Sequence, residues 1–331
     1  MSSTISRRSG RSGPAVPAQS SPPSAPRWGG RARRANSRSL RDMPLMIAML
    51  LPCFGLLSVF VLVPLGLGVK LSFFSWDGVA ARMTPAGVSN YVRIWLDPRF
   101  VASLGRTAIW AVMHLVLAVG GALLLATLIN EIGWRRVRTV FRSLAFLPNV
   151  LALSVVGVVW AQIYNPSIGL LNSGLQRIGL GHLGHAWLGE DHLALFSVGV
   201  ASAWQGFGFY LVLFLAGMQT IDPTLYEAAM IDGATGWQRF GHVTLPGLYN
   251  TMSLVLVLAF SNALKGFGTV WSMTQGGPSN ATELAAVYVW RSAFQSGRIG
   301  LAAAAGLTIA VLTIIGVTLL TRWRDRVAEE R

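Results

Sequence analysis

The side chains able to bind a polar solute are few, and they interrupt stretches of the chain that are otherwise apolar. Six of them fall in two such stretches: Trp204, Gln205, Tyr210, Ser261, Asn262 and Lys265. Aromatic faces beside amide, hydroxyl and ammonium groups are the mixture that a sugar needs for stacking and hydrogen bonding. Lys265 lies three residues after Asn262 and four after Ser261, which predicts overlapping faces of one helix. Together these groups indicate a water-filled passage for a polar solute.

Each of these side chains also has a plain structural role open to it. Trp and Tyr anchor membrane–water interfaces, Ser and Asn join helices, and Lys265 can extend to the outer headgroups. Taken one at a time, the residues fit these roles better. Considered together, the six residues favour a passage. A charge at the centre of a membrane helix costs about 2.5–3.5 kcal/mol, so polar groups in such helices tend to face protein or water.

The signatures of catalysis are missing from the sequence. There is no Gly-x-x-x-x-Gly-Lys-Ser/Thr loop, and neither of the two lysines, Lys70 and Lys265, follows a glycine loop, so we do not expect the chain to cradle ATP phosphates. There is no His-Glu-x-x-His and no strand–turn–helix setting for a nucleophilic serine. We therefore expect no catalytic residue, no metal site and no cofactor in this chain.

The elements that must position the polar residues are membrane helices. Of the 331 residues, 53% are hydrophobic and 12% are charged, whereas soluble domains carry about 25% charged residues. A spanning helix needs about 20 apolar residues, and six stretches qualify: 43–67, 107–130, 144–164, 193–219, 248–264 with some extension, and 299–321. The sequence therefore predicts an all-α integral membrane protein with six transmembrane helices over residues 43–322. No Asp or Glu lies inside any of the six stretches.

The basic residues predict how the helices are oriented. The formal net charge is +14, and 18 of the 27 Lys and Arg lie on one side of the predicted spans, in 1–42, 131–142, 220–247 and 322–331. The positive-inside rule then places both termini in the cytoplasm. Residues 1–42 are rich in Ser, Pro, Gly and Arg, which predicts a disordered basic tail, and 323–331 is predicted as a short cytoplasmic tail. Because the basic residues adjoin spans and are not interleaved with aromatics, nucleic acid is not an expected partner.

One polar stretch, residues 226–246, lies between two long apolar runs and reads YEAAMIDGATGWQRFGHVTLP. The Asp-Pro pair at 222–223 is a helix-start signal, and it predicts a helix over 225–232. Gly233 fits the left-handed position that ends such a helix. The Thr-x-x-Gln capping box at 235–238 starts a second helix. The stretch is therefore predicted to form a helix, a tight turn and a helix on the membrane surface.

The same stretch resembles the EAA loop of the membrane-spanning subunits of bacterial ABC importers. That pattern is Glu-Ala-Ala, three residues, Gly, nine residues and Ile-x-Leu-Pro. The matching residues are Glu227, Ala228, Ala229, Gly233, Val243, Leu245 and Pro246, with Val243 in place of the usual Ile. Pro246 is also expected to limit the second helix. Local physics alone favours an ordinary capped loop between two spans, and the spacing of the whole pattern reverses that preference.

The resemblance implies a type I ABC importer-like permease subunit in the bacterial plasma (inner) membrane. The loop, including Asp232 before Gly233, would dock in a cleft of an ATPase subunit. Small Ala228 and Ala229 would permit close approach, and Gly233 the sharp turn. The implied partners are a second homologous permease, two ATP-binding subunits that hold ATP and Mg, an extracytoplasmic solute-binding protein and the lipid bilayer.

Other segments between about 70 and 320 resemble the carbohydrate-uptake group of these permeases. They are SFFSWDG, NYVRIWLDPRF, RSLAFLPN, Trp187-Leu188-Gly189, WQGFGFYLVLFLAGMQTI and the run Thr274, Gln275, Gly276, Gly277 and Pro278 followed by Thr282. The last run resembles a Thr-x-Gly-Gly-Pro signature, which implies an outer loop that faces the binding protein. The family also implies that substrate passes along the fifth span. Gly268 departs from the pattern, because an Asp commonly follows Lys-x-Phe there, and this leaves the substrate open.

Several other interpretations stay open. A permease of this family can serve another solute, such as a polyamine or a metal. A secondary transporter is disfavoured because it usually shows internal repeats and intramembrane acids, and an integral-membrane enzyme because its polar residues would have to converge on one site. A metal site in the second outer loop, at His182, His185, Glu190, Asp191 and His192, is conceivable. It is disfavoured because no helical register preorganises those residues.

Overall fold

The computed structural model describes residues 43–131 and 135–329 and divides the chain into two units, Met1–Leu62 and Val63–Arg331. In the first unit the described part is helix α2 (Met43–Leu57) followed by a π-helical segment, η1 (Ser58–Leu62). The tail predicted at 1–42 lies outside the described residues. All of the predicted site residues belong to the second unit.

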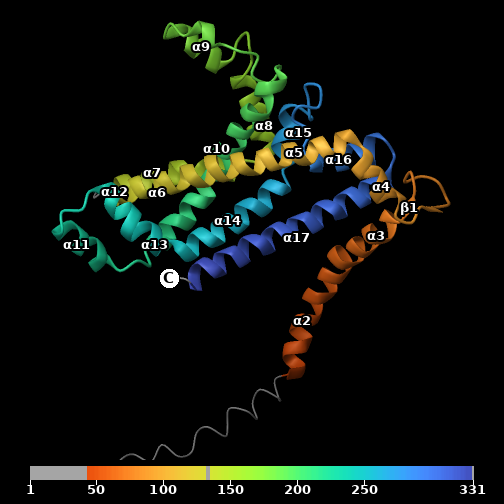
Figure 1. Ribbon diagram of the computed structural model, residues 1–331, viewed down its shortest axis with the longest axis horizontal. Helices are drawn as coiled ribbons and strands as arrows, with labels where there is room; N and C mark the ends of the chain where they lie inside the picture. The colour runs from red at the N-terminus through yellow and green to blue at the C-terminus, as the bar shows by residue number, and fades with distance from the viewer. Residues whose placement is uncertain (1–42, 132–134, 330–331) are drawn as a thin grey trace, which may run out of the picture. The chain divides into compact units, whose positions relative to one another are not determined.

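The second unit is a series of helices with one small two-stranded β-sheet (Figure 1). Its first part contains α3 (Val63–Ser72), β1 (Phe74–Ser75), β2 (Thr84–Pro85), α4 (Ser89–Leu96), α5 (Pro98–Met113), η2 (His114–Gly120) and α6 (Gly121–Glu131). The middle part contains α7 (Arg135–Val150), α8 (Leu153–Ile163), α9 (Leu170–Arg177), η3 (Gly181–Leu183) and α10 (Asp191–Met218). The last part contains α11 (Pro223–Ile231), α12 (Gly236–Arg239), η4 (Phe240–Thr244), α13 (Leu245–Gly247), α14 (Tyr249–Leu264), α15 (Gly268–Met273), α16 (Ala285–Trp290), η5 (Arg291–Gln295) and α17 (Ile299–Glu329).

Within the described residues, four helices are long and apolar enough to cross a membrane. They are Ala48–Ser72, Pro98–Glu131, Asp191–Met218 and Ile299–Arg322. Two bent pairs bring the number to six: Thr139–Val150 with Leu153–Ile163 at 100°, and Gly236–Gly247 with Tyr249–Leu264 at 74°. The prediction of a mostly helical membrane protein is confirmed. The all-α description misses only the antiparallel pair of two-residue strands β1 and β2.

Two predicted spans are not single straight helices. The stretch 144–164 breaks between α7 and α8, and the stretch 248–264 begins only after a sharp turn. In the first case Pro148 lies in the last turn of α7. Because proline has no N–H, the carbonyl of Leu144 loses its helical partner there. The helix ends two residues later, a break that the apolar composition of the stretch did not reveal.

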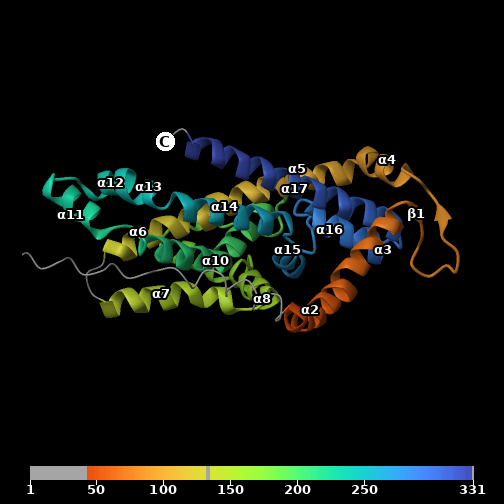
Figure 2. The ribbon, with the colours of Figure 1, turned by 90° about the horizontal axis from the view of Figure 1, so that it is seen from below.

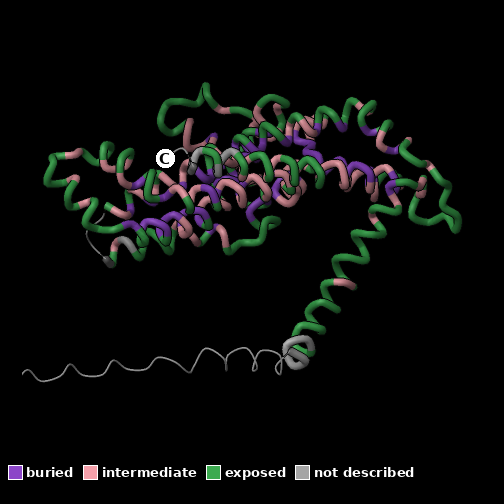
Figure 3. Tube along the Cα trace, turned by 60° about the horizontal axis from the view of Figure 1, so that its bottom comes forward, coloured by how far each residue is buried: buried purple, intermediate pink, exposed green. Residues whose placement is uncertain are grey.

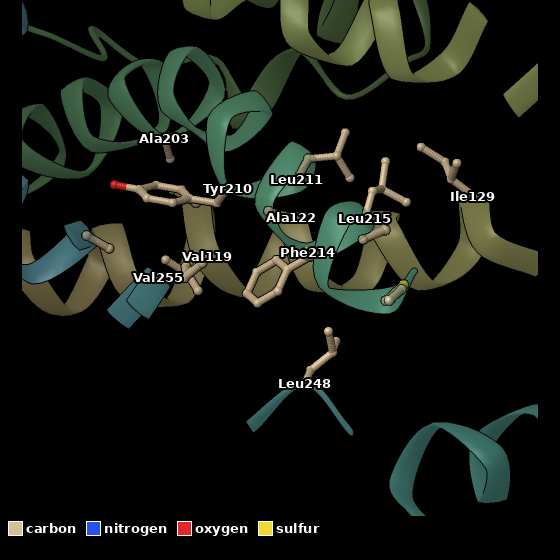
Figure 4. Packing of buried hydrophobic residues seen from close by; sticks show 14 of the residues in the cluster. Val119, Ala122, Ile129, Ala203, Tyr210, Leu211, Phe214, Leu215, Leu248 and Val255 are labelled. Carbon is tan, nitrogen blue, oxygen red and sulfur yellow. The ribbon is translucent and has the colours of Figure 1, made fainter. Parts of the chain in front are cut away.

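The largest apolar core lies where α10 packs against α6, η2 and α14. Its fully buried members include Leu211, Phe214 and Leu248, and Figure 4 shows Phe214 of α10 among side chains from the neighbouring helices. In lipid there is little hydrophobic drive between helices, so close packing matters more. Glycines provide it: a Cβ on Gly208 would lie 2.3 Å from the carbonyl oxygen of Ala145 in α7.

The second unit has two distinct ends. The hairpin of α11 and α12 lies at one end, and the β1–β2 pair with α4 lies at the other, as two perpendicular views agree (Figures 1 and 2). Buried residues follow the packed helices between these ends, whereas the α11–α12 hairpin is largely exposed (Figure 3). The long helices therefore connect two surfaces of different character.

Gly208→Ala should separate α7 from α10, because its new methyl group has no room beside Ala145. Overpacking of this kind costs about 1–3 kcal/mol, so we expect the purified protein to melt several degrees lower. The control is Gly105→Ala in α5, whose Cβ would meet nothing within 4 Å. It should melt like the wild type or slightly higher, because alanine is the better helix former. Equal melting of the two variants would contradict the close approach.

Candidate functional site

The polar hairpin at 222–246 forms as its sequence predicts. Asp222 caps α11, accepting a hydrogen bond from the backbone N–H of Thr224 at 2.9 Å. That N–H holds the pKa of the Asp222 carboxyl below its usual value. Gly233 follows with φ of +73°, a conformation that favours glycine. Thr235 and Gln238 then form the predicted capping box at the start of α12.

The prediction that Pro246 limits the second helix is wrong in detail. The helical path of α12 continues through η4 into α13, so Pro246 lies inside this path and the helix ends one residue later, at Gly247. The chain turns instead at Leu248, and α14 begins at Tyr249. Leu248 is fully buried while Leu245 is exposed, so packing of the Leu248 side chain fixes where the turn occurs.

Two contacts brace the hairpin. Tyr226 of α11 and Thr244 of η4 share a hydrogen bond of 3.0 Å between their hydroxyl groups, which ties its two arms together. Arg239 of α12 forms an ion pair of 2.8 Å with Glu131, the last residue of α6. The hairpin is therefore attached to a membrane-spanning helix outside its own sequence neighbourhood.

The remaining surface of the hairpin has no partner in the described chain. Glu227, Ala228 and Asp232 are exposed, and Ala229 is half-buried. Two large apolar side chains, Ile231 and Trp237, are 86% and 76% exposed. A shallow cavity of about 320 Å³ beside Gly233 is lined by Ala229, Asp232, Gly233, Ala234, Gln238, Arg239, His242 and Val243. Exposed apolar side chains of this kind are typical of surfaces that contact another protein or the membrane.

A second candidate site is a cavity of about 420 Å³ between α5, α7, α10 and the end of α14. Its lining combines rings, amides, hydroxyls and one ammonium group, and no carboxylate belongs to it. The residues are Trp110, His114, Asn149, Leu153, Ser202, Gln205, Gly206, Phe209, Tyr210, Asn262, Ala263, Lys265, Gly266, Phe267, Gly268 and Thr269. Such a set can stack on a solute ring and hydrogen-bond its hydroxyl groups.

The cavity brings together four of the six residues predicted for the passage: Gln205, Tyr210, Asn262 and Lys265. The other two do not line it. Trp204 packs edge-on against Trp160, with ring centroids 5.6 Å apart. The α10 residues of the cavity recur at helical spacing from Ser202 to Tyr210, and Trp204 falls on another face. Ser261 likewise lies outside the lining, one residue out of phase with Asn262.

The cavity also contains polar residues that sequence reasoning missed. His114 is the most informative, because its Nε2 lies 3.2 Å from the hydroxyl of Tyr210, to which Asn262 also hydrogen-bonds. These three side chains join η2, α10 and α14 into one polar chain. The signal in the sequence was a histidine inside an apolar stretch, four residues after Trp110, at a spacing that puts both on one helix face.

The departure at Gly268 has a structural counterpart. A Cβ at this position would lie 2.8 Å from Cδ1 and 3.1 Å from Cβ of Leu153. Leu153 of α8 therefore occupies the space that a larger side chain at 268 would need. The same wall of the cavity consequently presents an apolar group.

The Thr274–Pro278 run forms a loop at the start of segment 274–298, which lies between α15 and α17. The Thr274 and Thr282 hydroxyls lie 2.7 Å apart, and Thr282 donates to the carbonyl of Gly277 at 2.7 Å. Gly276 has φ of +93°, and the Gly277–Pro278 bond is cis. The loop is therefore cross-linked by its own residues.

A buried carboxylate anchors segment 274–298. The Glu283 side chain is fully buried, and its Oε2 accepts from Arg99 at 2.8 Å and from Arg291 at 2.5 Å. Arg106 also donates to the Glu283 carbonyl at 2.9 Å. These arginines come from α5 and η5, so the carboxylate of Glu283 links α5, 184 residues away at Arg99, to η5, which follows Glu283 closely in the sequence. Buried charges require such pairing.

Two of the histidines between α9 and α10, His185 and His192, pair with Glu190 at the surface. Glu190 accepts from His185 at 3.2 Å and lies 3.4 Å from His192. Over residues 43–131 and 135–329, no group of three or more His, Cys, Asp or Glu side chains is placed to hold a metal ion.

The fold and its two surfaces define a class of protein. A bundle of membrane helices encloses a polar cavity, and a capped hairpin stands exposed at one end. The sequence has no nucleotide-binding loop. A polar cavity within a bundle of membrane helices is typical of a membrane permease.

Comparison with known proteins identifies the family. The model of the binding-protein-dependent transport system inner membrane component matches residues 118–329, and the chain belongs to this family. A probable ABC transporter permease protein of Bacillus subtilis is 36% identical over 77% of this chain and 88% of its own length. The lactose transport system permease protein of Rhizobium radiobacter is 30% identical over 74% of this chain and 81% of its own length.

A solved structure has the same fold. It is a crystal structure of a bacterial ABC transporter involved in the import of the acidic polysaccharide alginate, with a TM-score of 0.76 and 25% identity over 89% of this chain and 99% of that one. The family membership confirms the prediction of an ABC importer permease subunit in the inner membrane. In this family ATP is handled by the partner ATPase, and the permease is not itself the enzyme.

Glu283→Ala should loosen segment 274–298, because it leaves Arg291, which is only 22% exposed, without its carboxylate. Removing one partner from a buried ion pair costs about 3–5 kcal/mol. We expect a clearly lower melting temperature and faster proteolysis within this segment. The control is Glu190→Ala, which removes a carboxylate whose histidine partners are 43% and 75% exposed and should cost at most about 1 kcal/mol. Equal effects of the two changes would rule out an anchoring role for Glu283.

Proposed function

We propose that this permease subunit imports a sugar or sugar-like solute handed to it by an extracytoplasmic binding protein. It works beside a second, similar permease and two ATP-binding subunits, with both of its own termini in the cytoplasm. The observation that carries the proposal is the cavity of about 420 Å³, in which rings and hydrogen-bonding groups face one space.

The composition of the cavity suits a polyhydroxylated solute. The rings of Trp110, Phe209 and Phe267 offer faces for stacking. The amides of Asn149 and Asn262 both donate and accept, as a sugar hydroxyl does. One relative is a lactose transport system permease, and the structural neighbour belongs to a transporter that imports alginate. Both solutes are saccharides, which supports a saccharide as the solute of this chain too.

The exposed hairpin is the contact with the ATPase in this proposal. Ile231 and Trp237 supply apolar surface, and Ala228 and Gly233 allow another backbone to come close. Closure of the ATP-binding subunits would then move the hairpin as a rigid body, a common form of switching. The Thr274–Pro278 loop at the other end of the proposed path faces the binding protein.

Two continuous connections lead from the hairpin to the cavity. The Arg239–Glu131 pair joins α12 to the run of α6 and η2, which carries His114. The turn at Leu248 joins α13 directly to α14, which carries Asn262. Because His114 and Asn262 both meet Tyr210, a displacement of the hairpin reaches both walls of the cavity.

Asn262→Leu removes an amide from the cavity while keeping comparable bulk, and it should impair uptake without preventing assembly or basal ATP hydrolysis. We expect at least about a tenfold loss, the equivalent of one hydrogen bond of about 1.4 kcal/mol. The measurement is solute uptake into proteoliposomes with the transporter's own binding protein. Asn250→Leu, an exposed position on the same helix outside the cavity, is the matched control. Uptake by Asn262→Leu with unchanged affinity, rate and sugar preference would remove Asn262 from the pathway.

Gly233→Asp should uncouple ATP hydrolysis from transport while leaving the protein inserted. A side chain at φ of +73° strains the turn, and its charge stands where the ATPase is proposed to dock. We expect uptake to fall to background while the ATP-binding subunits still hydrolyse ATP. Gly241→Asp adds the same charge to the same hairpin at a position without positive φ and with open space around it, and it should be milder. If a well-expressed Gly233→Asp transporter takes up solute at the wild-type rate, the docking idea fails.

A further inference from the structure

A polar cavity of about 590 Å³ lies at the end of the second unit opposite the hairpin. Its walls come from the β1–β2 loop, α4 and the start of α17. Three arginines line it, one from each of these parts: Arg82, Arg93 and Arg298. Figure 1 shows β1 and α4 at this end of the unit. Neither the passage nor the hairpin uses this cavity.

The three guanidinium groups have no partner in the described chain. Within residues 43–131 and 135–329, none of the three side chains forms an ion pair or a hydrogen bond, and all three residues are exposed. This contrasts with Arg99 and Arg291 nearby in the same unit, which share one carboxylate. The cavity arginines are therefore free to bind a ligand from outside.

The other polar groups of the cavity are already engaged. Asp77 accepts from the backbone N–H groups of Ala80 at 2.7 Å and Val79 at 3.0 Å, and these bonds hold its pKa below the usual value. Asn90 donates to the carbonyls of Ser72 and Phe74. With one carboxylate held by its own loop against three guanidinium groups, the cavity has an excess of positive charge.

The walls of the cavity are held in place by the backbone. Ile299 donates to the carbonyl of Trp76 at 3.0 Å, which fixes Arg298 beside the β1–β2 loop. At Gly300 a Cβ would lie 1.9 Å from the carbonyl oxygen of Phe74, so α17 touches this loop directly. The pocket is consequently formed before any ligand arrives, which lowers the free energy that binding must supply.

We propose that this arginine pocket binds the carboxylate side chains of an acidic surface segment on the extracytoplasmic binding protein. Guanidinium groups match carboxylates in planar, paired hydrogen bonds. The inference rests on the proposed function only in taking this end of the unit as the outer one. It adds a contact at the first outer loop, separate from the Thr274–Pro278 loop.

The lining favours a protein over a lipid headgroup. Among its lining residues only Trp76, Ala80 and Leu301 have apolar side chains, so there is little wall for acyl chains. The volume of about 590 Å³ exceeds what one phosphate group fills. The family is also defined by a binding-protein partner. Charges at such a contact mainly speed association, by about 10- to 1,000-fold at low salt.

The test measures association of the transporter's own binding protein, loaded with its solute, with the whole transporter in nanodiscs of phosphatidylcholine alone. The variant carries Arg82→Gln, Arg93→Gln and Arg298→Gln together. We expect association at least about tenfold slower at low salt, with most of the salt dependence gone. Basal ATP hydrolysis should stay at the wild-type level, which shows that the variant is assembled. The control is Arg177→Gln, an exposed arginine of α9 outside the pocket.

Three outcomes would overturn the proposal. Wild-type association and salt dependence in the triple variant exclude an acidic protein segment. Wild-type association together with less bound phosphatidylglycerol than wild type, in nanodiscs containing that lipid, assigns the pocket to headgroups. Thermal stabilisation by inorganic phosphate that the triple variant loses, again without slower association, assigns it to a small anion. If the wild-type transporter takes up no solute with any binding protein, the proposed function is wrong. If the triple variant shows normal uptake and normal association, only the proposal for the arginine pocket is wrong.

Discussion

Every backbone amide and carbonyl in the hydrocarbon layer must find a partner inside the protein, and this constraint shapes the whole structure. A helix satisfies it by itself, so each break in a helix needs a local remedy. The breaks after Val150 and after Leu264 both border the polar cavity. At the first break, Gln205 reaches the freed carbonyl of Leu151 at 3.5 Å. The cavity is thus built where helices end, and its polarity is partly a consequence of the groups those ends release.

The charged groups divide by how their charge is balanced. Glu283 is buried, its Oε2 is paired with two arginines of its own chain, and these pairs tie the segment that carries Glu283 to α5 and η5. The Arg239–Glu131 pair is partly exposed and joins a surface hairpin to a long helix. The arginines of the β1–β2 cavity are unbalanced within the described chain. Charged side chains that are paired within the chain stabilise its fold, whereas the unpaired arginines at the surface are available to bind a partner.

Sequence reasoning succeeded where the cause is local. Asp222, Gly233 and the Thr235–Gln238 box act on their own backbone neighbours, and each forms as expected. It failed where the cause is a distant contact. Helical phase in α10 depends on which face meets α7 and α14, so Gln205 lines the cavity and Trp204 does not. The partners of Glu283 lie as far as 184 residues away, and no local pattern marks them. The arginine pocket was missed for the same reason, because three separate segments form it.

The π-helical segment His114–Gly120 has a consequence for how the long helix from Pro98 to Glu131 is used. One extra residue in a turn rotates everything beyond it by roughly 100° relative to a regular helix. Before the segment, Phe100 and Trp110 each belong to a smaller apolar cluster, one with Tyr288 and the other with Val198. After it, Ala122 and Ile129 belong to the largest apolar core. The helix from Pro98 to Glu131 therefore packs against neighbours on different sides along its length.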